Sequence, residues 1–152
     1  MKKLFFILLI VSLTACTNDD DTIPSTTNNT ASVQSQIQSS AQTGTWRVSL
    51  YSEDGKNETT NFVGYTFTFN TNISISASNQ KNNYTGTWSI TDNNSSDDSV
   101  NDVDFNILFI LTNNFQDFNV DCNVLSHAQS KIELRDISGG NGGIDLLTFE
   151  KN

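Results

Sequence analysis

The sequence is poor in the residues on which most catalysis and nucleic-acid binding depend. Its 152 residues include one histidine, His127, one proline, Pro24, and two cysteines, with only eight basic side chains against 17 acidic ones. The formal net charge of −9 repels nucleic-acid phosphates, which excludes a nucleic-acid binder. His127 lies near no nucleophile pattern, and the acidic residues converge on no recognisable site. We therefore expect no enzyme activity, no cofactor and no metal site.

The long apolar run of the chain lies at its start. Lys2 and Lys3 are positively charged and residues 4–13 are almost entirely apolar, but ten residues form a helix of only about 15 Å, about half of a bilayer core. The pattern therefore predicts a secretory signal peptide over residues 1–15. The run ends in Leu13-Thr14-Ala15-Cys16, which resembles the bacterial lipobox, whose cysteine is acylated and begins the mature protein. The alternative is an ordinary signal peptide with a chance cysteine.

An acidic stretch over residues 17–21 follows Cys16 and resembles the surface-export signal of Bacteroidetes lipoproteins. The resemblance implies a palmitate-type lipid anchor in the outer membrane and display on the cell surface; the alternative is a solvated start to a linker. Without Lys2 and Lys3, six basic and 17 acidic side chains remain, a net charge of about −11 that repels anionic lipid. The expected membrane partner therefore binds through the acyl chains on Cys16.

Residues 16–42 are expected to be the acylated cysteine and a flexible tether. Ser, Thr, Asn and Gln dominate this stretch, which cannot bury enough apolar surface to fold alone. The alternative is a short amphipathic helix that lies against the domain. Four apolar residues have the near-helical spacing that this requires: Ala31, Val33, Ile37 and Ala41.

Apolar and polar side chains alternate over most of residues 43–152, the predicted folded domain. A period of two is typical of half-buried β-strands, and turn sequences such as Asp54-Gly55 separate the segments. About eight strands joined by mostly short loops form an antiparallel up-and-down meander. Closure into a barrel removes both exposed edges, and the pattern predicts an all-β, about eight-stranded fold that is either a small closed barrel or a β-sandwich.

Two further features are given structural interpretations. Cys122 lies in an alternating stretch, residues 120–124, that places it on the apolar face, so we expect a buried and inert thiol. Residues 92–104 contain five carboxylates, a density of oxygen ligands that suits calcium, but their spacing does not match an EF-hand. We therefore expect a solvated loop there.

The opening of the first predicted strand, Gly44-Thr45-Trp46, resembles the Gly-x-Trp that lipocalins carry at this place. The whole domain is similar to the lipocalin-like domains of Bacteroidetes lipoproteins. The resemblance implies a lipocalin-like barrel in which Arg135, from a late strand, packs over the Trp46 ring; the alternative for Trp46 is plain core packing. The chain departs from the family in lacking a Thr-Asp-Tyr motif and a disulfide pair.

We therefore expect a lipocalin-like lipoprotein that binds a small apolar ligand inside its barrel without catalysis. Five inward aromatic residues are predicted to line the ligand site: Tyr65, Phe67, Trp88, Phe105 and Phe109. The alternative is a filled barrel that acts through its loops as a protein-interaction, inhibitory or accessory module of the cell envelope, with no particular protein partner indicated. An apolar cavity of roughly 300 Å³ or more would favour the first function.

Overall fold

The computed structural model describes residues 27–92, 103–137 and 143–152. Residues 1–15, Cys16 and most of the acidic loop lie outside these ranges. The described elements, in chain order, are α1 (Thr27–Ala41), β1 (Trp46–Glu53), β2 (Lys56–Asn57), the 3-10 helix η1 (Thr59–Phe62), β3 (Thr66–Phe69), β4 (Ser74–Ser78), β5 (Asn83–Asp92), β6 (Val103–Leu108), β7 (Val120–Ala128), β8 (Lys131–Ile137) and β9 (Ile144–Lys151).

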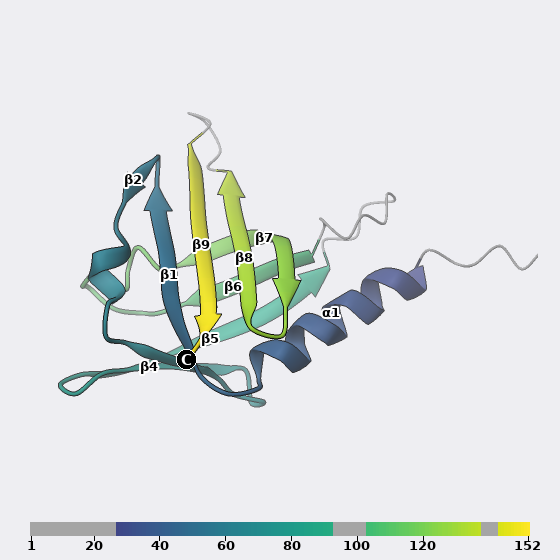
Figure 1. The fold of residues 1–152 in the computed structure, drawn as a ribbon, viewed down its shortest axis with the longest axis horizontal. Helices are drawn as coiled ribbons and strands as arrows, with labels where there is room; N and C mark the ends of the chain where they lie inside the picture. Colours follow the sequence, from purple (N-terminus) through teal and green to yellow (C-terminus); the bar gives the residue numbers. More distant parts are fainter. Residues whose placement is uncertain (1–26, 93–102, 138–142) are drawn as a thin grey trace, which may run out of the picture.

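Eight antiparallel strands close into one barrel, and this confirms the predicted fold class (Figure 1). From β3 to β9 each strand pairs with its neighbour along the chain, and β1 closes the sheet against β9. The short β2 is an additional strand that pairs only with the end of β1. Because one sheet closes on itself, the alternative of a β-sandwich does not apply.

The closure at β1 is uneven. β1 pairs with β9 from Trp46↔Lys151 to Ser52↔Leu146, but it pairs with β3 at a single position, Trp46↔Phe67. Beyond that position η1 packs against β1, where the Tyr51 amide donates to Thr59 Oγ1 at 2.8 Å. The 3-10 helix therefore occupies the seam that β1 and β3 leave between them.

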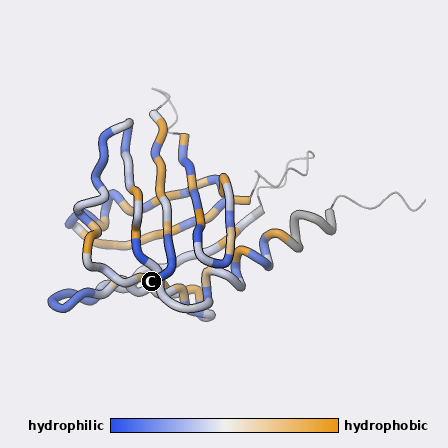
Figure 2. Tube along the Cα trace, viewed as in Figure 1, coloured by the Kyte–Doolittle hydropathy of each residue, from blue (hydrophilic) through white to orange (hydrophobic). Residues whose placement is uncertain are grey.

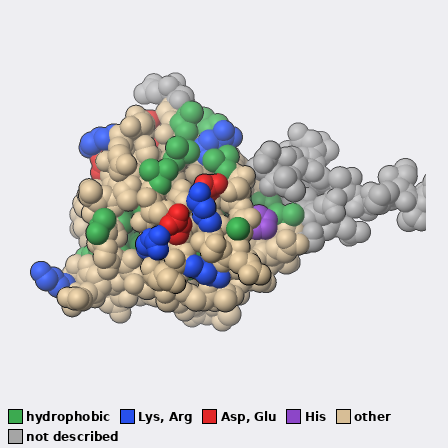
Figure 3. All heavy atoms as spheres, viewed as in Figure 1, with side chains coloured by type: hydrophobic (Ala, Val, Ile, Leu, Met, Phe, Trp, Pro, Cys, Tyr) green, Lys and Arg blue, Asp and Glu red, His purple; other side chains and the backbone are tan. Residues whose placement is uncertain are grey.

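The period-two pattern separates an apolar interior from a polar exterior. On β3 and β4 the buried side chains are Phe67, Phe69, Ile75 and Ala77, while the alternating threonines and serines are half-exposed. Figure 2 shows the same alternation of hydropathy along the strands. On the outer face of β1, β8 and β9, acidic and basic side chains lie side by side (Figure 3), including the exposed Arg47–Glu150 pair at 2.5 Å.

Part of the segment expected to be a flexible tether is helical. α1 buries Ile37 and Ala41 completely against the barrel, Gln34 Nε2 donates to the Ile90 carbonyl of β5 at 2.7 Å, and Trp46 Nε1 donates to the Ala41 carbonyl at 2.8 Å. The barrel supplies the apolar contacts that this polar segment cannot supply alone, so over residues 27–41 the alternative of a docked amphipathic helix holds. Within the described ranges, no helix is long and apolar enough to cross a membrane.

The two ends of the barrel carry different elements. We call the end at which α1 lies beside the β3–β4 and β7–β8 turns the helix end (Figure 1). The opposite end carries η1, the β4–β5 turn and the β6–β7 segment, residues 109–119, and we call it the loop end.

Candidate functional site

The five aromatic residues predicted to line a ligand site lie in or against the core. Phe67, Phe105 and Phe109 are fully buried, Trp88 is 4% exposed and Tyr65 is half-buried. Each of them contacts other aromatic rings. The Phe105 centroid, for example, lies 5.5 Å from that of Phe69 and 5.7 Å from that of Trp88. The inward orientation is as expected, but the rings pack on one another.

Two phenylalanines that the sequence analysis did not single out fill the loop end. Phe115 and Phe118 come from the β6–β7 segment and are both buried. The Phe118 centroid lies 4.6 Å from that of Phe62 on η1, 5.5 Å from that of Phe67 and 6.0 Å from that of Phe149. The only sequence signal was a pair of phenylalanines three residues apart in a polar, non-alternating stretch.

Hydrogen bonds hold this segment in place. The Tyr51 hydroxyl donates to the Asp117 carbonyl at 2.6 Å, and the Phe109 amide donates to Asn119 Oδ1 at 2.6 Å. The Phe115 amide donates to Asn113 Oδ1 at 3.0 Å. Backbone groups at several points of the segment are thus satisfied within the protein, which fixes the direction in which the two phenyl rings enter the barrel.

The expected packing of Arg135 over Trp46 is wrong. Lys151 Nζ lies over the Trp46 ring, 5.1 Å from its centroid. The strand register explains the difference: Trp46 is opposite Lys151, whereas Arg135 is opposite Leu146, which in turn is opposite Ser52. Six residues of β1 separate the two rows, a distance of about 20 Å.

Gly44 and Trp46 otherwise hold the positions that the sequence analysis expected of them. Gly44 has a φ of +78°, which glycine adopts without strain, just before the chain enters β1. Trp46 is fully buried, and its indole donates to α1 as described above. The Arg135 Nε is itself buried without a hydrogen-bond partner.

Cys122 is buried in the core, as predicted. It is 1% exposed, and burial, together with nearby carboxylates led by Asp136, raises the pKa of its thiol to about 12. A protonated, enclosed thiol is a poor nucleophile, which argues against a reactive site here.

Of the acidic stretch, the structure describes only the two ends, Asp92 on β5 and residues 103–104 on β6. Asp104, on β6, is buried and accepts a hydrogen bond from Asn123 Nδ2 at 2.9 Å. Residues 93–102, which include three of the five carboxylates, lie outside the described ranges. Among the residues that the structure does describe, no group of three or more His, Cys, Asp or Glu is placed to hold a metal ion.

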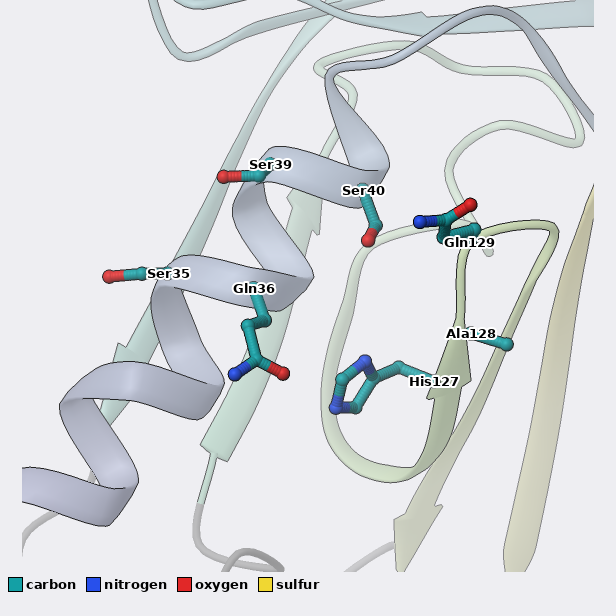
Figure 4. Close-up of a pocket in the computed structure, with 7 residues that line it drawn as sticks. All are labelled: Ser35, Gln36, Ser39, Ser40, His127, Ala128 and Gln129. Carbon is teal, nitrogen blue, oxygen red and sulfur yellow. The ribbon is translucent and has the colours of Figure 1, made fainter.

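Grooves mark the described surface of the barrel at both of its ends and on its outer wall. The first, of about 460 Å³ at the helix end, has His127 on its floor with the imidazole directed toward α1 (Figure 4). Its lining residues are Ser35, Gln36, Ser39, Ser40, His127, Ala128 and Gln129. The second, of about 440 Å³, follows the outer wall over β5 and β6, between the exposed side chains of Ile73 and Leu108.

The third groove, at the loop end, has a volume of about 190 Å³. Its lining residues are Asn61, Tyr65, Tyr84, Asn113, Asn114 and Phe115. The rings of Tyr65 and Tyr84 are stacked at 6.0 Å, and Asn82 Nδ2 donates to the Tyr65 hydroxyl at 3.0 Å. Burial and the neighbouring Tyr65 hydroxyl hold the pKa of Tyr84 above its ordinary value, so its hydroxyl stays protonated at neutral pH.

Comparison with known proteins gives little beyond this geometry. No family model and no curated protein matches the chain. Among solved structures, the chain is similar to the crystal structure of a DUF4847 family protein from Bacteroides vulgatus. The two share 17% sequence identity and a TM-score of 0.49, over 76% of this chain and 97% of that one.

Proposed function

We propose that this protein is a noncatalytic lipoprotein of the outer membrane that binds a partner through the outside of a filled barrel. The barrel is then a scaffold, and the loops and grooves on its surface are the functional parts. The observation that carries the proposal is the insertion of Phe115 and Phe118 into the loop end, where an apolar ligand would otherwise enter.

Ring contacts run through the interior from one end to the other. Trp88, which donates to the Asn70 carbonyl at the helix end, lies 5.7 Å from Phe105 between ring centroids. The contacts continue through Phe105–Phe69 at 5.5 Å, Phe69–Phe149 at 5.3 Å, Phe149–Phe118 at 6.0 Å and Phe118–Phe62 at 4.6 Å. An apolar ligand inside the barrel would have to displace part of this chain of rings, at the cost of its packing. This supports the filled barrel over the ligand-binding one.

The sequence supports attachment through Cys16. Residues 17–26 connect it to α1, and ten residues reach at most about 35 Å when fully extended. The chain enters the described domain through α1, which lies at the helix end, opposite the loop end. The surface that meets a partner outside the cell is therefore, in this proposal, the loop end.

The anchor is tested by Cys16→Ser. The variant should leave the membrane fraction, because acyl chains are the expected anchor. Thr17→Ser, which leaves the cysteine intact, is the matched control and should stay membrane-bound. Retention of Cys16→Ser in carbonate-washed membranes would contradict the lipoprotein assignment.

The filled barrel is tested by native mass spectrometry of protein purified from its own membrane. The protein should carry no bound small apolar molecule, and benzene should not raise its melting temperature. Phe118→Ala should change the second result, because a cavity left by a phenyl ring in an apolar core binds benzene. A stoichiometric apolar ligand on the unmodified protein would overturn the proposal in favour of ligand binding inside the barrel.

A further inference from the structure

The loop-end groove is lined by a different combination of groups from the helix-end groove and the outer-wall groove described above. Each of its six lining residues is an asparagine or an aromatic residue, so the lining carries amides, phenols and ring faces and no charge. Its volume of about 190 Å³ is smaller than the roughly 300–1,000 Å³ of pockets for drug-sized ligands. It has room for one small ring-shaped unit, which can belong to a longer chain that continues outside the groove.

The polar groups of the groove are held in place before any ligand arrives. Asn61 Nδ2 donates to Glu58 Oε2 at 2.7 Å, which leaves Asn61 Oδ1 as an acceptor. Asn113 Oδ1 accepts from the Phe115 amide at 3.0 Å, and the amide of Asn113 is also hydrogen-bonded to the Tyr84 hydroxyl. An amide side chain offers two donor hydrogens and two acceptor lone pairs, so each still has capacity for a ligand. Fixed donors and acceptors reduce the entropy lost on binding.

The aromatic groups form a rigid floor. Phe115 lies beneath the stacked tyrosines, with its ring centroid 5.0 Å from that of Tyr65 and 4.8 Å from that of Tyr84. Phe115 is buried, whereas both tyrosines remain partly exposed. Each tyrosine thus presents an apolar ring and a polar hydroxyl to the same small space.

These groups match the chemistry of a sugar ring. A pyranose has an apolar face of C–H groups and a rim of hydroxyls that both donate and accept hydrogen bonds, which fits ring faces bordered by amides and phenols. The net negative charge of the chain disfavours anionic sugars. We propose that the loop-end groove, formed by Tyr65, Tyr84 and the amides of Asn61, Asn113 and Asn114, binds one ring of a neutral carbohydrate.

This inference rests on the proposed function, because it takes the filled barrel as the scaffold and names the partner of its outer loops. It also agrees with the placement of the groove at the end opposite α1, through which the chain enters the domain. A polymer outside the cell could reach the groove there without passing the anchored end of the molecule.

The test uses the mature protein in nonionic detergent, run through native gels that contain a neutral glucan, galactomannan, xylan or arabinogalactan. At least one neutral polymer should retard the protein, and polygalacturonate should not. Asn114→Ala and Tyr84→Phe should weaken retention about tenfold, the effect of losing one hydrogen bond to the ligand. Asn114 is exposed, so its variant should keep the melting temperature of the unmodified protein.

Asn106→Ala is the matched control, because it removes an amide from the outer wall, where Asn106 Nδ2 donates to Thr91 Oγ1 at 3.0 Å, outside the groove. It should be retarded as strongly as the unmodified protein. Mobility that is unchanged in all four neutral polymers, retention that survives both groove variants, or stronger retention by polygalacturonate would each overturn the inference. If retention fails while the native mass spectrum still shows no apolar ligand bound to the protein, the inference alone is wrong and the proposed function stands.

Discussion

The two ends of the barrel are closed by segments of different origin. At the loop end, Phe115 and Phe118 enter from a segment between two paired strands, and both of their rings contact the Phe67 ring of the barrel wall. At the helix end, α1 precedes the first strand and buries only Ile37 and Ala41 completely. The first closure is part of the hydrophobic core, whereas the second is an addition to it. Substitutions in the loop-end closure should therefore destabilise the whole barrel, whereas substitutions in the contact of α1 should release only the helix.

Phe118→Ala should give the largest effect. It removes a fully buried ring that contacts several others, and such truncations cost about 3–5 kcal/mol through lost burial and the cavity left behind. Denaturant titration of the free energy of unfolding measures it. Phe118→Leu keeps most of the volume and should cost less than half as much. A loss below about 1 kcal/mol for the alanine variant would show that the loop-end closure is not part of the core.

Ile37→Ala should cost less, about 2 kcal/mol, at the lower end of the range for buried isoleucine. The loss cannot exceed the energy with which α1 docks, because the helix can detach while the barrel stays closed. Hydrogen exchange should therefore accelerate at the amides of α1 and not at those of β8 or β9. Equal acceleration throughout the barrel would show that both ends unfold together, which would contradict the separate release of α1.

Gln34→Ala tests the polar part of the same contact. Its amide donates to the Ile90 carbonyl, and a typical hydrogen bond contributes about 1 kcal/mol. The change should lower the stability of α1 docking by about that amount, as measured by exchange at the α1 amides. Gln38→Ala, on an exposed position of the same helix, is the control and should have little effect. Equal effects of the two variants would contradict a specific contact at Gln34.

The buried thiol of Cys122 should make the stability of the core depend on pH. The folded-state pKa of its thiol, about 12, lies above the ordinary value of 9.0. The favourable contribution of the neutral buried thiol is therefore fully present below pH 9 and is lost as the pH rises from 9 toward 12. Cys122→Ala should reduce this alkaline slope of stability in a series of thermal melts. An identical slope in both proteins would assign it to other groups.

The barrel could be predicted from the sequence because the patterns that indicate strands and turns involve residues close together in the chain. Alternation along the strands, the turn residues and the lack of proline after Pro24 identified the fold, and Cys122 was correctly placed in the core. Near-helical spacing also indicated α1, but the composition of the segment favoured a tether. Whether the helix docks depends on contacts with β5 that lie more than 50 residues away in the chain.

The features that were not predicted depend on strand register and on the conformation of loops. Arg135 was assigned to Trp46 because both positions matched a family pattern, whereas the pairing of β1, β8 and β9 places them in different rows. Phe115 and Phe118 lie outside any periodic stretch, so no pattern indicated that they point inward. The same holds for the loop-end groove, whose residues come from three separate parts of the chain. The requirement for glycine at position 86 also comes from the neighbouring strand, because a Cβ there would lie 2.4 Å from the Leu108 carbonyl oxygen of β6.

The pairing of β1 with β9 also sets the order in which the barrel can form. The first strand has its main partner in the last strand, and Asn152 N donates to the Thr45 carbonyl at 3.0 Å, across more than 100 residues. Contacts of such sequence separation form late, because a long loop must close before they contribute any stability. During synthesis β1 therefore remains nearly unpaired until residues 144–151 have been made. The meander from β3 to β8 can assemble earlier from neighbouring hairpins, so the final step of folding is the joining of the two ends of the domain.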